Sequence, residues 1–167
     1  MTRRLIILSI VTVILALNLL GCARPGANSE TLTGAWKGKV QFKTGAYAQI
    51  KDLEFMRVFN AGGTMTESSN YDGAPPVPPA YGIWEKTGRD QFEAAYQFYW
   101  NSIPSAFDEI SKSGGFLPDG YGVVKEKITV SAGGKSYKST INLMMFDKSG
   151  KRIGEDAANA EAERMEL

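Results

Sequence analysis

Apolar and polar residues alternate along most of the chain after residue 31, and glycine-rich turns interrupt the alternation. The alternation is clearest in segment 91–100, where the residues on one face are Phe92, Ala94, Tyr96, Phe98 and Trp100. A period of two predicts a β-strand with one buried face. Seven further segments with a similar pattern begin and end at turn residues. The eight predicted strands are 32–42, 53–60, 64–70, 81–87, 91–100, 121–132, 135–147 and one within 152–167.

Helical periodicity is limited to a long loop that we predict at 101–120. The residues there with the spacing of one helix face are Ile103, Phe107 and Ile110. Ser105 stands three residues before Asp108, which is the spacing of a capping box, so we expect one short helix. The Ala- and Glu-rich run 155–166 also has helical propensity. We predict a strand there, because a closed sheet needs its last strand in this position.

Eight strands joined mostly by hairpins predict an all-β fold, an eight-stranded up-and-down antiparallel barrel with one short helix in a long loop. A closed sheet has no exposed edge strand. Its interior is either filled by side chains or has room for one small ligand. Two connections, the proline-rich 71–80 and 101–120, are longer than hairpin loops. Long loops at the rim of a barrel often act as lids or contact surfaces.

The first 21 residues have the pattern of a signal peptide. Arg3 and Arg4 precede a mostly apolar stretch, 5–20, and Gly21 stands directly before Cys22. This ending resembles the lipobox of bacterial lipoproteins, which implies cleavage before the cysteine and its acylation with palmitate-type chains. The alternatives are an uncleaved membrane helix and a plain secretory signal. The apolar stretch is short for a spanning helix, and the one cysteine of the chain lies where lipidation requires it.

These features divide the chain into three parts. Residues 1–21 are a lipoprotein signal peptide, 22–31 are a flexible tether that begins at the lipidated Cys22, and 32–167 are a barrel domain. We therefore expect the protein in the bacterial cell envelope, held to a membrane by its lipid. The anchor is expected on the periplasmic side of the outer membrane in a Gram-negative cell, and otherwise on the outer face of the cell membrane.

Composition narrows the possible chemistry. Without Arg3 and Arg4 the chain has 17 basic and 18 acidic residues, so no strong field favours nucleic acid as a partner. Histidine is absent, which removes the commonest metal ligand and the commonest general base at neutral pH. An acylated Cys22 leaves no thiol nucleophile. We therefore assign no catalytic residue, metal or cofactor, and we expect a protein that is not an enzyme.

Five glutamates lie in the first seven predicted strands. Nothing in the sequence places any two of them at the distance that a catalytic acid–base pair requires. We interpret most of them as solvated, and we interpret the run Lys-Glu-Lys at 125–127 as an alternating outward face. The residues concerned are Glu54, Glu67, Glu85, Glu93 and Glu126.

Three short motifs mark the starts and turns of the predicted strands: Gly34-Ala35-Trp36, 59–65 and 82–88. In this order they resemble calycins, the lipocalin and avidin superfamily, over about residues 32–166. The resemblance implies a barrel and a ligand-binding role without naming an activity. It also implies that a basic residue of the last strand packs across the tryptophan of the first strand. By that resemblance, Arg164 lies over Trp36 and closes the barrel.

Aromatic residues are the candidate ligand contacts. An inward aromatic side chain can form the wall of a pocket or plain core, and both interpretations stay open. The candidate ligand-binding aromatic residues are Trp84, Phe92, Tyr96, Phe98 and Trp100.

A charged pair is a further candidate for the site. If Phe59 faces Met65 across the first glycine-rich turn, then Arg57 faces Glu67. Phe55 and Phe59 flank Arg57 at a spacing of two, which would place the pair inside the barrel, where it could orient a polar group of a ligand. In the alternative arrangement of faces the pair lies in solvent, and the inward residues are Met56 and Val58.

Three functions are consistent with these features. The leading hypothesis is a lipid-anchored barrel that binds a small, mostly apolar molecule in its interior. The alternative is an interaction or inhibitor lipoprotein that binds another exported protein through its rim loops. We rank third an isomerase or cyclase that works inside the barrel.

Overall fold

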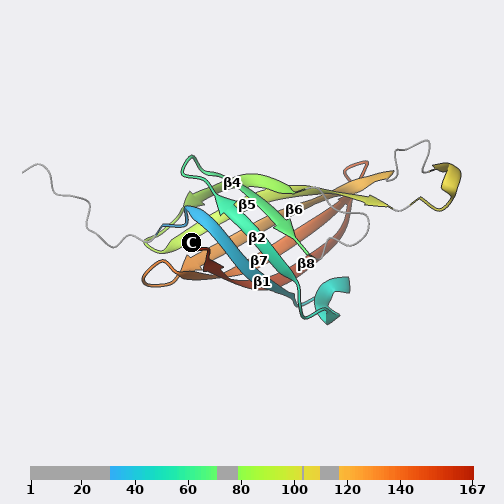
Figure 1. Ribbon diagram of the computed structural model, residues 1–167. Coiled ribbons are helices and arrows are strands. Elements are labelled where there is room, and N and C mark those ends of the chain that lie inside the picture. Colours follow the sequence, from blue (N-terminus) through green and yellow to red (C-terminus); the bar gives the residue numbers. More distant parts are fainter. Residues whose placement is uncertain (1–30, 71–78, 103, 110–116) are drawn as a thin grey trace, which may run out of the picture.

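The computed structural model describes residues 31–70, 79–102, 104–109 and 117–167 (Figure 1). The predicted signal peptide, Cys22 and most of the tether lie outside these residues, as does most of the proline-rich connection. The strands are β1 (Gly34–Phe42), β2 (Glu54–Phe59), β3 (Thr64–Ser69), β4 (Ala80–Lys86), β5 (Gln91–Ser102), β6 (Leu117–Val130), β7 (Ser136–Asp147) and β8 (Arg152–Arg164). One turn of 3-10 helix, η1 (Ala46–Gln49), follows β1.

The eight strands form a closed barrel in chain order. Each pairs antiparallel with its neighbours, and β8 pairs with β1 from Trp36 opposite Arg164 to Phe42 opposite Ala158. The predicted all-β, eight-stranded up-and-down barrel is therefore confirmed. Alternate residues of each strand face the interior, and the buried apolar side chains among them form the core of the domain.

Strand β8 forms although its sequence favours a helix. Its inward residues Ala158, Ala160 and Ala162 are buried, whereas Glu161 and Glu163 between and beyond them are exposed. Pairing with β1 on one side and β7 on the other gives this segment hydrogen bonds and burial at once. Helix propensity differs by less than about 1 kcal/mol per residue, so tertiary pairing decides the outcome.

The long loop is shorter than predicted. Strands β5 and β6 continue to Ser102 and from Leu117, and these two residues pair with each other past a register shift at Trp100. Residues 107–109 form the expected helical turn, and the backbone nitrogen and hydroxyl of Ser105 donate to the carboxylate of Glu109. Phe107 is 86% exposed, so the predicted apolar helix face is not packed there. Ile103 and Ile110 lie outside the described residues.

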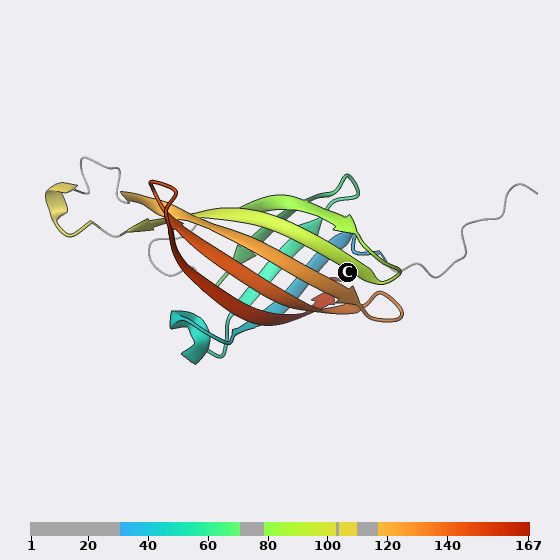
Figure 2. The same cartoon turned by 180° about the vertical axis from the view of Figure 1, so that it is seen from behind.

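The barrel has two different ends. Tight turns, at 60–63, 87–90 and 131–135, join the strands at one end. The connection 43–53 and the turn 148–151 lie at the other end, where β3 and β5 end and β4 and β6 begin. Strands β5 to β8 are also longer than β2 to β4, so their far ends run past the shorter strands (Figure 2). We call the first end the sealed end, and the second the mouth.

Glycines on the inner face let aromatic rings lie flat against the barrel wall. Phe55 pairs with Gly38, Phe98 with Gly122, and Trp100 with Gly120. A Cβ atom on any of these glycines would lie within 2.6 Å of an atom of the paired ring. Each ring therefore covers the backbone of the next strand, an arrangement that also compensates for the missing side chain of the glycine.

Candidate functional site

Arg57 points into the barrel. On β2, Phe55, Arg57 and Phe59 are buried, whereas Met56 and Val58 are 53% and 41% exposed. The predicted register is also confirmed, since Arg57 faces Glu67 in the ladder between β2 and β3. The structure thus decides between the two arrangements of faces and excludes the one with Met56 and Val58 inside.

Four side chains from four other strands meet around this arginine. Its Nε donates to Glu67 Oε2 at 2.5 Å, and its Nη1 donates to Glu126 Oε1 at 2.7 Å and to the Tyr137 hydroxyl at 3.0 Å. Its Nη2 donates to the Tyr96 hydroxyl at 2.7 Å, and that hydroxyl donates to Glu126 Oε2 at 3.0 Å. We call these five residues the arginine cluster; it lies in the centre of the barrel.

The outward interpretation of residues 125–127 was wrong for its middle residue. Glu126 is 1% exposed and belongs to the arginine cluster, while Lys125 and Lys127 point to solvent. The period of two along β6 explains this result, because Glu126 is in phase with the buried Val124 and Ile128. Glu67 is buried as well, as in the inward one of the two arrangements predicted for the Arg57–Glu67 pair.

Electrostatics keep the arginine cluster in one protonation state. Burial alone would lower the pKa of Arg57, but the carboxylates of Glu126 and Glu67 more than offset it, and the pKa is raised. Burial raises the pKa of the Tyr137 phenol, against the opposing influence of Arg57. Arg57 therefore stays charged and Tyr137 stays protonated near neutral pH. Four hydrogen bonds from the guanidinium go to the protein itself, so the cluster holds the barrel centre together. A role of Arg57 and Glu67 in orienting a ligand stays a prediction.

Arg164 closes the sealed end as the resemblance predicted. Its guanidinium carbon lies 4.2 Å from the centroid of the Trp36 ring. It donates to the carbonyl oxygens of Gly134, Thr33 and Thr31 at 2.7, 2.6 and 2.7 Å. The Trp36 ring is fully buried. These contacts tie the start of the first strand, the last strand and the β6–β7 turn together.

Trp84 and Phe92 also lie at the sealed end. The indole nitrogen of Trp84 donates to the carbonyl oxygens of Asn60 and Thr64 at 3.0 and 3.2 Å. The Trp84 ring packs 6.1 Å from Phe59 and 5.8 Å from Phe92, centroid to centroid. The structure therefore separates these two candidates from Phe98 and Trp100, which lie near the mouth. Their predicted contact with a ligand is not tested by this packing.

Exposure of the inward aromatic residues rises toward the mouth. Along β5, Phe92 and Tyr96 are buried, whereas Phe98 and Trp100 are half-buried with ring centroids 6.5 Å apart. On β7, buried Leu143 is followed by half-buried Met145. These apolar residues form a ledge on the inner face of the longer strands. We call the apolar ledge the set Phe98, Trp100, Leu143 and Met145.

Asp156 lies beside the apolar ledge and was missed by the sequence analysis. It is 5% exposed and is the neighbour of Leu143 in the β7–β8 ladder. Thr44 donates its hydroxyl to Asp156 Oδ1 at 3.2 Å, and the same hydroxyl accepts the backbone N–H of Ala157 at 3.1 Å. Asp156 is in phase with the inward alanines of β8, so the strand period identifies its direction.

One buried hydroxyl has no hydrogen-bond partner within the described part of the chain. It is the Oγ of Ser139 on the inner face of β7, which is 7% exposed. Its ladder neighbours are Ile128 and Ala160. An unpaired buried hydroxyl is costly, so this position is one where a bound water or ligand group would be accommodated favourably.

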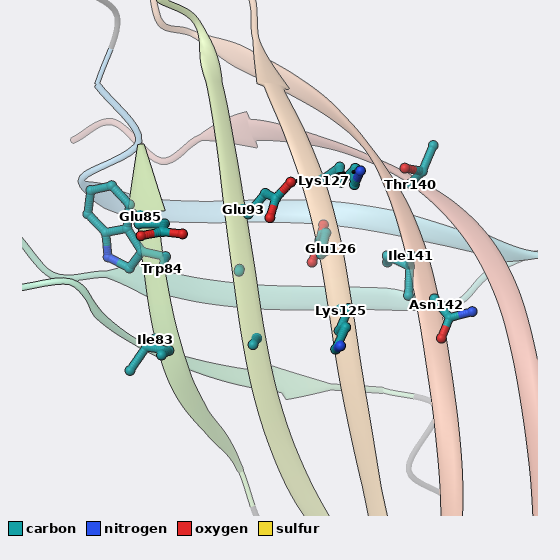
Figure 3. A pocket seen from close by; sticks show the side chains of 12 residues that line it. Ile83, Trp84, Glu85, Glu93, Lys125, Glu126, Lys127, Thr140, Ile141 and Asn142 are labelled. Atoms are coloured by element: carbon teal, nitrogen blue, oxygen red, sulfur yellow. Dashed lines mark ion pairs between the residues drawn. The ribbon is translucent and has the colours of Figure 1, made fainter. Parts of the chain in front are cut away.

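The outer surface of strands β4 to β7 is also hollowed. One hollow of about 610 Å³ is bordered by Ile83 and by charged side chains of both signs, among them Glu85, Glu93, Lys125 and Lys127 (Figure 3). The Lys127 and Glu93 side chains approach to 3.8 Å. A second hollow of about 640 Å³ contains no charged side chain. Its outward residues are Tyr81, Ile83, Gln97, Tyr99, Tyr121 and Val123.

Neither metal ligation nor a membrane-spanning helix is found in the parts of the chain that the structure describes. Those residues contain no group of three or more acidic, cysteine or histidine side chains arranged to hold a metal ion. None of their helices is long and apolar enough to cross a membrane. Comparison with protein-family models, curated proteins and solved structures finds no match for this chain.

Proposed function

We propose that this chain is an exported, lipid-anchored barrel protein that binds a small, mostly apolar ligand at its mouth. The observation that carries the proposal is the gradient of burial along the inner face. Tyr96 is buried, yet Phe98 and Trp100 beyond it are half-buried, on strands that run past their shorter neighbours. Concave, mostly apolar surfaces with a few polar groups are typical of small-molecule sites.

The rest of the barrel supports this location. The arginine cluster blocks the centre, and Trp36, Trp84 and Arg164 block the opposite end. A ligand would therefore rest on the apolar ledge, with the arginine cluster as its floor. This arrangement corresponds to the calycin style of binding that the sequence resemblance implies, and membership of that superfamily is part of the proposal. The role is binding, without catalysis or a cofactor.

Tryptophan emission tests the proposed site. We expect an uncharged probe, 1-octanol, to shift the emission of the full chain saturably through Trp100. Met145→Asp places a charge on the apolar ledge and should weaken this binding about tenfold or more. Met56→Asp is the matched control, because Met56 is exposed on the outer face, and it should leave the affinity unchanged. Equal affinity in both variants, or no saturable response, would contradict a site at the mouth.

The anchor is a separate part of the proposal. Cys22→Ser should release the protein from the membrane fraction of bacterial cells and leave the unfolding transition of the barrel unchanged, since the barrel begins at Gly34. Fractionation in high salt measures the first effect. Retention of the variant in the membrane fraction under those conditions would show that the anchor is not the acylated cysteine.

A second function, binding of another exported protein, is favoured by the uncharged outer hollow. Tyr81, Ile83 and Tyr99 are 63%, 65% and 69% exposed there, and clustered exposed apolar side chains often mark interaction sites. A photo-crosslinking residue at Gln97 should then join one defined exported protein in intact cells. Ile83→Asp combined with Tyr99→Asp should remove that product without changing the octanol titration. No product at Gln97 would leave the ligand-binding function as the better account.

A further inference from the structure

We propose that the polar end of the ligand is a cation, such as a protonated amine, and that it pairs with Asp156. This inference rests on the proposed binding function at the mouth and specifies the chemical class of the ligand. It starts from a contrast between the buried acidic residues of the barrel. Glu67 and Glu126 both bind Arg57, but within the described ranges no basic group lies within ion-pairing distance of Asp156.

Burial makes the missing partner significant. Asp156 is 5% exposed, and among the described residues the one hydrogen bond to its carboxylate comes from Thr44, at 3.2 Å. A carboxylate can accept about four hydrogen bonds, and a buried charge without compensation is expensive. A cationic group at this position would supply the missing charge. The chain itself holds Asp156 in place, because the Thr44 hydroxyl is fixed by the backbone N–H of Ala157.

The position of Asp156 suits a ligand with an apolar tail. Its row across the sheet contains Leu143 and Val124, and the next row toward the mouth contains Gly154, Met145, Gly122 and Phe98 in succession. Trp100 lies one row further out, opposite Gly120. Two rows span roughly 13 Å along a strand, so an eight-carbon chain fits on the apolar ledge while its head group contacts Asp156. The Phe98 ring covers Gly122 and the Met145 methyl group covers Gly154, so apolar side chains line this path.

The formal charges of the barrel interior point the same way. The arginine cluster combines one positive and two negative side chains, and Asp156 adds a third negative one, which gives a formal sum of −2. An anionic ligand, such as a fatty acid, would meet like charge, whereas a cation would meet opposite charge. The geometry therefore selects against a carboxylate head group as well as for an amine.

Three probes of equal chain length test this inference on the unchanged full chain at pH 7: octylamine, 1-octanol and octanoate, each in the same medium. We expect octylamine to bind about tenfold more tightly than octanol, and octanoate to bind most weakly. Asp156→Asn should bring octylamine to the affinity of octanol. Glu155→Gln is the matched control, because Glu155 is the exposed neighbour that contacts Asn142 and Arg152 on the outer face, and it should keep the preference.

The outcomes separate this inference from the proposed function. Octanol binding without a preference for octylamine would overturn the cation assignment and leave the apolar site standing. The same holds if octanoate binds as tightly as octylamine, or if Asp156→Asn retains the preference. If none of the three probes binds, the site at the mouth is wrong and the inference falls with it. The comparison of probes on the wild-type chain needs no variant, so it remains decisive if Asp156→Asn does not fold.

Discussion

The sealed end and the mouth differ in how far their polar side chains are hydrogen-bonded within the chain. At the sealed end Arg164 lies on Trp36 and donates to three carbonyl oxygens, and the Trp84 indole is hydrogen-bonded twice. At the mouth, the one hydrogen-bond partner of the Asp156 carboxylate among the described residues is the Thr44 hydroxyl, and Phe98, Trp100 and Met145 are half-buried. The arginine cluster between them is satisfied from within the chain. The difference separates groups that complete the fold from the group that is proposed to bind a ligand.

The largest expected effect on stability is at the arginine cluster, which lies between the sealed end and the mouth. Arg57→Met would leave Glu67 and Glu126 buried without their cation, and breaking a buried pair in this way costs about 3–5 kcal/mol of the free energy of unfolding. Denaturant unfolding measures the loss. Lys127→Met is the control, because its pair with Glu93 is exposed and should contribute no more than about 1 kcal/mol. Equal effects in the two variants would show that the arginine cluster is not a structural unit.

At the sealed end, Arg164→Ala should lower the free energy of unfolding by about 2 kcal/mol. The change removes a cation–π contact and leaves three carbonyl oxygens without their donor. Arg152→Ala, an exposed arginine at the other end of the same strand, should have little effect. If both variants are equally stable, the sealed end does not depend on this closure.

The protonation of Tyr137 in the arginine cluster makes the free energy of unfolding depend on pH. Burial raises the pKa of this phenol, and its ordinary value is about 10. The unfolded chain therefore releases the proton first as pH rises. The stabilisation is complete below about pH 10 and declines above it, by about 1 kcal/mol between pH 10 and 11. Unfolding at both pH values should show this loss in the wild-type chain and a smaller one in Tyr137→Phe. An identical pH dependence in both would indicate that Tyr137 ionises in the folded state.

The smallest effect on stability is expected at the mouth. Asp156→Asn should change the free energy of unfolding by no more than about 1 kcal/mol, since no cation of the described chain loses its partner. Glu126→Gln, the same change inside the arginine cluster, should cost about 1.5–3 kcal/mol, because Arg57 and Tyr96 both bind that carboxylate. A larger loss of stability in Asp156→Asn than in Glu126→Gln would show that the mouth, and not the arginine cluster, depends more on its buried carboxylate.

Local patterns in the sequence predicted the barrel and part of its interior. The period of two in 91–100 identified the inward face of β5, and the first glycine-rich turn fixed the register that brings Arg57 opposite Glu67. These features depend on neighbours in one strand or one hairpin. The resemblance to calycins, rather than any local pattern, predicted Arg164 over Trp36.

The remaining parts of the site depend on contacts between residues that are far apart in the chain, which a local sequence pattern does not predict. Glu126 and Tyr137 reach Arg57 from β6 and β7, 69 and 80 residues away in the chain, and only the closure of the barrel brings them together. Asp156 lies in a segment whose composition suits a helix as well as a strand, so the sequence did not show which way its side chain points. The longer strands at the mouth were also not predicted, because β5 and β6 extend beyond the predicted ends, to Ser102 and from Leu117.

The side-chain bridge between the two ends of the domain has a consequence for its orientation. Arg164 binds the carbonyl oxygen of Thr31, so the chain enters the barrel at the sealed end. If the proposed lipid on Cys22 holds the chain to a membrane, the tether would reach the barrel at its sealed end, and the mouth would lie at the end away from the point of attachment. A guest molecule would then exchange with the aqueous compartment instead of passing directly from the lipid leaflet. The anchor would fix the position of the protein in the envelope, while loading and release would proceed on the side away from the membrane.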